Sequence, residues 1–193
     1  MLEDGFMNSQ IISKLGKDYD KTNRLYYVMN DDLRKIRQSH QLYPGRLDDN
    51  DMASVAILVN KNDAADGIHH FVGPTRQNNH TFQLVIITPE QLQLLKQFGH
   101  RAISLDDTHN CTKYNVKVTT IVVVNNNDRG LPAGYLISNT TTTSDVTILF
   151  QKVRELFEKE NLKFCPAQFM SDEAHVFWNA YVTVIFDQIN LQF

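Results

Sequence analysis

The chain has 193 residues, of which 42% are hydrophobic and 21% are charged, and its formal net charge is −3. These values are typical of a folded globular protein, and they exclude a disordered, collagen-like or coiled-coil chain. The excess of acids gives no support to nucleic-acid binding through a generally basic surface. Because the sequence has no apolar run of about 18 residues and no secretory signal, we expect a soluble, intracellular protein with no membrane partner.

The cysteine and histidine residues do not form a metal-binding pattern. Cys111 and Cys165 each stand alone, without a second cysteine at C-x-x-C spacing. The seven histidines are scattered, and only His69 and His70 are adjacent. The sequence therefore predicts neither a disulfide framework nor a zinc site.

Residues 1–100 are predicted to form a helical and hairpin region that leads into the rest of the chain. A short helix is expected from Asn30, and a second one is expected after Asn50, because each asparagine can cap the segment that follows it. The apolar run after Asn50 also fits a buried strand by its periodicity, although we favour the helix. Two β-rich runs, 69–75 and 81–88, predict a hairpin.

The expected helix from Asn30 carries three basic residues, Arg34, Lys35 and Arg37. They give local positive charge that could hold DNA. The alternative is a solvated helix face, because Asp31 and Asp32 lie beside them and reduce the attraction for phosphate.

The clearest helix signal in the sequence follows Thr88. Thr88 is an N-cap residue, Pro89 occupies the first helical position, Gln91 completes a capping box, and Gly99 follows the last turn. These residues predict a helix over 89–98.

Residues 101–193 show a regular succession of strands and helices. Strands are expected at 102–105, 117–124, 132–138 and 167–171, with helices after Thr142 and at 173–186. Thr142 and Asp145 form a capping box at the start of the first of these helices. In the second helix, Trp178 has the spacing of a core residue, which we favour over a base-stacking role. The final residues alternate as if a fifth strand began at Ile189, Leu191 and Phe193.

This order, β-β-β-α-β-α-β, predicts an α/β fold with a ribonuclease-H-like mixed sheet, preceded by the helical and hairpin segment. In such a sheet the first and fourth strands of 101–193 are neighbours. Asp106 and Asp172 end these two strands, so they are expected to converge although they lie 172 − 106 = 66 residues apart. Two close carboxylates repel each other, and a bound divalent metal ion relieves the repulsion.

Residues 102–186 resemble the catalytic core of Mutator-like element (MULE) transposases. In that family a strand ends in D-x-T, often D-x-T-H, a hairpin turn carries D-x-x-G, and a later strand ends in S-D or T-D. The segment LDDTHN places the first family acid on Asp106, and FMSDEA places the second on Asp172. Residues 82–103 also resemble the region that leads into this core.

The resemblance implies a DDE-type transposase of the nucleus, which cuts and joins DNA at transposon ends by two-metal phosphoryl transfer with Mg²⁺ or Mn²⁺ and can form homo-oligomers. Asp106 and Asp172 would be its catalytic and metal-binding residues. Asp107, Thr108 and His109 would be neighbours of the site or would touch substrate phosphate. Two alternatives stay open: Asp107 replaces Asp106 as the first acid, or these residues only end a strand and, at Asp172, cap a helix.

The sequence departs from the family pattern at the third acid. The family carries a glutamate on a helix after a long insertion, whereas only 193 − 172 = 21 residues follow Asp172 here. The Cys and His usually found near the fifth strand are also missing. Glu173 and Asp187 are poor substitutes, because they lie at the two ends of the last predicted helix. We therefore expect a transposase fragment that is inactive by itself.

Two other functions remain as alternatives. The first is a non-catalytic, transposase-derived module that binds DNA or protein. The second is a self-sufficient ribonuclease-H-like nuclease that takes its third acid from Glu155 or Glu158 in the helix after Thr142.

Overall fold

The structure is a computed structural model that describes residues 2, 6–40, 42, 46–48, 50–74, 82–109, 112, 114–172 and 174–185. The chain divides into two compact units, residues 1–57 and 58–193. The expected division between residues 100 and 101 differs from this one, because the predicted hairpin belongs to the same sheet as the later strands. None of the helices in the described part is long and apolar enough to cross a membrane.

The first unit contains α1 (Asn8–Asp18), the short helix η1 (Arg24–Tyr27) and α2 (Asn30–Ser39). Its small core is made by Ile11, Leu15 and Leu33. The helix predicted from Asn30 is confirmed, but Asn30 is its first residue and does not cap it. Instead, the Asp32 carboxylate accepts a hydrogen bond from the Met29 backbone N–H at 3.0 Å.

The apolar run after Asn50 forms a helix, α3 (Asp51–Lys61). The Asn50 side-chain oxygen accepts hydrogen bonds from the backbone N–H groups of Met52 at 2.9 Å and Ala53 at 3.2 Å. The predicted N-cap is therefore confirmed, and the alternative of a buried strand is wrong. A short helix η2 (Ala64–Asp66) then leads into the sheet.

The second unit is built on a mixed six-stranded sheet with the order β1-β2-β5-β4-β3-β6. The strands are β1 (Ile68–Val72), β2 (Gln83–Ile86), β3 (Ile103–Thr108), β4 (Lys117–Val124), β5 (Gly130–Ser138) and β6 (Phe169–Ser171). The helices are α4 (Pro89–Phe98), α5 (Thr143–Glu158) and α6 (Ala174–Ile185). Neighbouring strands are antiparallel except β3 and β6, which are parallel. The predicted α/β class and these elements are confirmed; the strand expected at residues 189–193 lies outside the described residues.

The N-terminus of α4 has the predicted capping box. The Thr88 hydroxyl accepts a hydrogen bond from the Gln91 backbone N–H at 3.3 Å, and the Gln91 side chain accepts one from the Thr88 N–H at 2.9 Å.

We expect Thr88→Ala to lower the free energy of unfolding by about 1 kcal/mol, because a helix N–H loses its partner. Urea unfolding measures the loss. Thr88→Ser keeps the hydroxyl and should retain the wild-type stability; equal losses in both variants would contradict this role of the cap.

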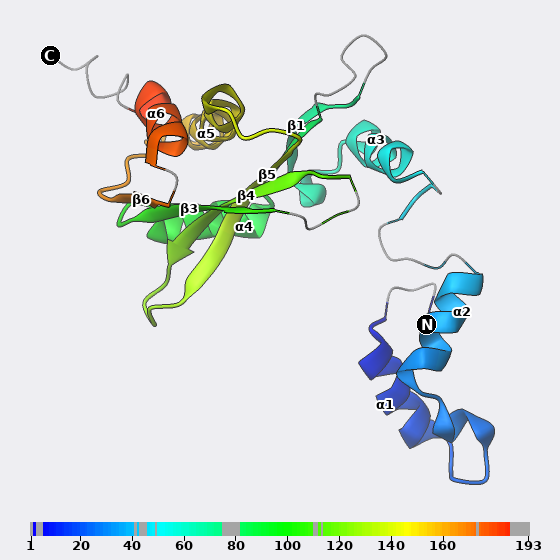
Figure 1. Ribbon diagram of the computed structural model, residues 1–193. Coiled ribbons are helices and arrows are strands. Elements are labelled where there is room, and N and C mark those ends of the chain that lie inside the picture. The colour runs from blue at the N-terminus through cyan, green and yellow to red at the C-terminus, as the bar shows by residue number, and fades with distance from the viewer. Residues whose placement is uncertain are drawn as a thin grey trace, which may run out of the picture. The chain divides into compact units, whose positions relative to one another are not determined.

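The core lies on one face of the sheet. On this face Ile103 and Leu105 of β3 pair with Val123 and Ile121 of β4, and all four are at most 1% exposed. The three helices of the unit contribute to the same cluster, with side chains that include Leu95, Phe98, Leu149, Phe150, Phe177 and Ile185. Figure 1 shows α5 and α6 lying together over the sheet.

The other face of the sheet is more open. Side chains alternate between the faces of a strand, so the neighbours of the core residues point to this second face. They include Ile86, Val118, Val122, Val124, Tyr135 and Ile137, all of which are partly exposed and none of which belongs to the core cluster. The residues of β3 that alternate with Ile103 and Leu105 stand on this open face.

Trp178 of α6 differs from its prediction as a core residue, because its side chain is 45% exposed. It lies at the margin of the core, against the rings of Phe169 and Tyr181, with ring centroids 6.0 and 5.9 Å away. Helical spacing identified the correct face of α6. It could not show that Trp178 stays partly open to solvent beside Phe169 of the short strand β6.

Candidate functional site

Asp106 and Asp172 come from neighbouring parallel strands. The last pair between β3 and β6 is Leu105 with Ser171, and each aspartate is the next residue of its chain segment. Adjacent strands in a sheet lie about 4.8 Å apart. The two aspartates therefore leave the sheet side by side, as their positions in the sequence predicted.

The Asp106 side chain is accessible. It alternates with the buried residue Leu105, so it stands on the open face of the sheet, and the residue is exposed. Within the described part of the chain no hydrogen bond or ion pair engages its carboxylate. Asp172 is exposed as well. A ligand can thus reach both residues from solvent.

Asp107 has a different environment from Asp106. It lies on the core face of β3, opposite Thr119 of β4, and is partly buried. One carboxylate oxygen accepts a hydrogen bond from the Thr119 hydroxyl, and the other accepts one from the Thr141 hydroxyl at 2.7 Å. Both oxygens are therefore engaged by protein groups, which favours Asp106 over Asp107 as the first acid.

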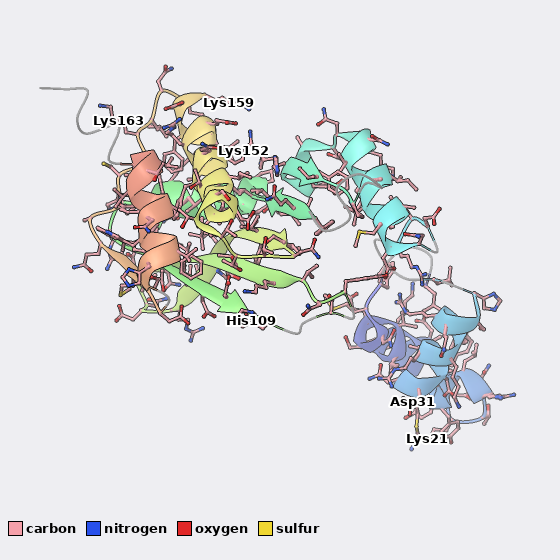
Figure 2. The ribbon with its side chains drawn as sticks, turned by 45° about the horizontal axis from the view of Figure 1, so that its top comes forward. Lys21, Asp31, His109, Lys152, Lys159 and Lys163 are labelled. Carbon is pink, nitrogen blue, oxygen red and sulfur yellow. The ribbon has the colours of Figure 1, made fainter. Side chains whose placement is uncertain are left out.

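Thr108 is the last residue of β3, His109 follows it, and both are exposed. Figure 2 shows His109 just beyond the end of this strand. Glu173 and Asp187, which were expected to be poor substitutes for a third acid, lie outside the described residues.

A buried polar network centred on Asp145 was not predicted from the sequence. Asp145, only 6% exposed, accepts hydrogen bonds from the Gln83 side-chain amide at 2.6 Å, the Thr140 hydroxyl at 2.9 Å and the Thr142 hydroxyl at 2.8 Å. The capping box identified only the contact between Asp145 and Thr142. The run of threonines at 140–143 was the remaining signal in the sequence, because such a run beside a cap offers several hydroxyl donors to buried carboxylates.

Glu155 and Glu158 do not lie where a third acid is needed. α5 begins beside the end of β3, as the contact between Thr141 and Asp107 shows. Glu155 is ten residues beyond Asp145, and at a rise of 1.5 Å per residue this places it about 15 Å further along the helix. Glu155 pairs with Lys152 at 2.8 Å instead. The alternative of a nuclease completed by these residues is therefore not supported.

The residues present fit a divalent metal ion only in part. Carboxylate oxygens are the ligands that Mg²⁺ and Mn²⁺ prefer. Asp106 and Asp172 supply two such groups. No group of three or more His, Cys, Asp and Glu side chains placed for a metal occurs among the described residues. The pair can therefore be part of a metal site, with water or substrate oxygens as the remaining ligands.

The basic residues of α2 are largely engaged within their own unit. Arg37 donates hydrogen bonds to the Asn8 side chain at 3.1 Å and to the backbone oxygen of Leu42 at 3.5 Å. Arg34 lies 3.7 Å from the Asp31 carboxylate in an exposed ion pair. These contacts favour the interpretation of this helix face as structural and solvated over its use to hold DNA.

Comparison with known proteins found no matching family model, no matching curated protein and no matching solved structure. The function of the site is therefore argued from its residues and from their geometry.

Proposed function

We propose that the second unit is a ribonuclease-H-like, metal-binding core of a Mutator-like DNA transposase, and that Asp106 and Asp172 hold its divalent ion. Intact members of that family cut and join DNA by phosphoryl transfer. For this chain we propose that these two acids bind a divalent metal ion.

One observation carries the proposal. β3, β4 and β5 form an antiparallel meander, α5 follows, and β6 returns parallel to β3 with Leu105 beside Ser171. This order brings an acid from the motif D-D-T-H next to an acid from the motif S-D-E-A. The family pattern that the sequence resembles has its two acids at the ends of the same two strands, which supports the proposal.

The chemistry of this site would come from two carboxylates on an accessible face. In a two-metal phosphoryl transfer, one divalent ion would activate the attacking oxygen and the other would stabilise the leaving oxygen. Asp106 and Asp172 would hold a divalent ion between them and neutralise its charge. The open face around Asp106 leaves room for a DNA phosphate, and Thr108 and His109 stand where they could contact it.

Calorimetric titration of the full chain with MnCl₂ tests this proposal. We expect saturable binding, and we expect it to be weak, because two carboxylates are a small ligand set for a divalent ion. Circular dichroism checks that the sample is folded. A folded chain that takes up no Mn²⁺ would contradict the proposal.

The second candidate is a non-catalytic, transposase-derived module that binds DNA or protein. Fluorescence anisotropy with a labelled DNA duplex separates the two functions. A metal-binding core should bind DNA more tightly with Mn²⁺ and should lose this gain in Asp106→Asn, whereas the non-catalytic module should bind equally with and without the metal.

A further inference from the structure

Asp107 connects three segments of the chain at the end of β3. Its carboxylate accepts hydrogen bonds from Thr119 of β4 and from Thr141, which precedes α5. Thr119 is completely buried, so this contact holds Asp107 on the core side of the sheet. A single side chain therefore joins β3, β4 and the start of α5.

The threonines before α5 alternate between two aspartates. Thr140 and Thr142 donate hydrogen bonds to Asp145, while Thr141 between them donates to Asp107. Asp145 in turn accepts a hydrogen bond from Gln83 of β2. The position of Thr141 is thus fixed from both sides, and the end of β3 is tied through it to a buried network that reaches β2.

The direction of Asp106 depends on Asp107. Successive side chains of a strand point to opposite faces, so a β3 residue held on the core face turns its neighbour to the open face. Residues 106–108 are also paired with β4, so the ladder sets the path of the strand and the two threonine contacts anchor its last residues to the start of α5. Loss of these contacts would loosen the end of β3 and, with it, the backbone that carries Asp106 beside Asp172.

We infer that Asp107 is a positioning residue, which holds the end of β3 so that Asp106 can share a divalent ion with Asp172. This inference rests on the proposed function of the same site. It also assigns Asp107 no contact with the ion, because Asp106 and Asp107 point to opposite faces and cannot turn toward one ion together.

Thr141→Val tests the inference, since it removes a hydroxyl that holds Asp107 and changes neither acid. We expect the Kd for Mn²⁺ to rise about tenfold, in the lower part of the range for groups that orient metal ligands. Thr141→Ser keeps the hydroxyl and should restore wild-type affinity.

Thr140→Val is the matched control. It removes the neighbouring threonine hydroxyl, which binds Asp145 at 2.9 Å and not Asp107. Both valine variants should lose stability to urea, but only Thr141→Val should lose Mn²⁺ affinity. A purely structural role for Asp107 would instead leave the affinity of both folded variants at the wild-type value, and that result would overturn the inference.

A double-mutant cycle excludes direct metal binding by Thr141. If Thr141 acts through Asp107, then Thr141→Val should have no further effect on Mn²⁺ affinity in an Asp107→Ala background. Additive losses would overturn the inference but leave the proposed metal site intact. If the folded wild-type chain binds no Mn²⁺, the proposed function and this inference both fail, which distinguishes the two cases.

Discussion

Asp106→Asn and Asp172→Asn should each reduce Mn²⁺ binding by the chain below detection. Asparagine has almost the same shape as aspartate but carries no charge, so each substitution removes one of the two anionic ligands. The loss should exceed the roughly 10–100-fold cost of removing a group that only orients a ligand. Calorimetric titration of each purified variant against wild type measures it.

Asp128→Asn is the control for these two variants. Asp128 lies in the exposed turn between β4 and β5 and has a positive φ of 57°, a conformation that asparagine also adopts readily. This variant should bind Mn²⁺ as wild type does. The free energy of unfolding of Asp106→Asn should also lie within about 0.5 kcal/mol of the wild-type value, as is usual for exposed substitutions. Full Mn²⁺ binding by either site variant would exclude that aspartate as a ligand.

Asp145→Ala should cause the largest loss of stability among the variants considered. The substitution leaves the buried amide of Gln83 without its acceptor and removes the acceptor of Thr140 and Thr142. Hydrogen bonds to a charged group and stranded buried donors each cost more than an ordinary hydrogen bond, so we expect a loss of about 3 kcal/mol or more in the free energy of unfolding. Urea unfolding followed by circular dichroism measures this loss.

Glu155→Ala provides the comparison on the same helix. Glu155 has only a surface ion pair with Lys152, in which the two side chains are 47% and 26% exposed. Such surface pairs contribute little to stability, so the free energy of unfolding of this variant should lie within about 0.5 kcal/mol of the wild-type value. Equal stability losses in the alanine variants of Asp145 and Glu155 would show that the buried network contributes nothing beyond helix propensity.

The sequence predicted the elements of the second unit because their local signals are strong. Thr88 with Gln91, and Thr142 with Asp145, mark two helix starts, and both capping boxes form as expected. The β-branched run at 117–124 indicated a central strand, which β4 is. The neighbouring places of Asp106 and Asp172 followed from the order of these elements.

Other features depend on contacts between distant segments, which local patterns do not encode. The role of Asp107 requires Thr141, 34 residues away, and the burial of Asp145 requires Gln83, 62 residues away. The exposure of Trp178 depends on how α6 packs against Phe169 of β6. The compact units divide after residue 57 and not after residue 100, and periodicity shows a hairpin but not which sheet it joins.

Paramagnetic broadening by Mn²⁺ in the NMR spectrum of the full chain locates the ion without any substitution. At substoichiometric Mn²⁺, we expect the amide signals of Asp106, Thr108 and Asp172 to disappear together. Signals from the turn at 125–129, at the opposite end of the sheet, should persist. Broadening confined to one of the two strand ends, or centred on another part of the chain, would contradict a metal site shared by Asp106 and Asp172.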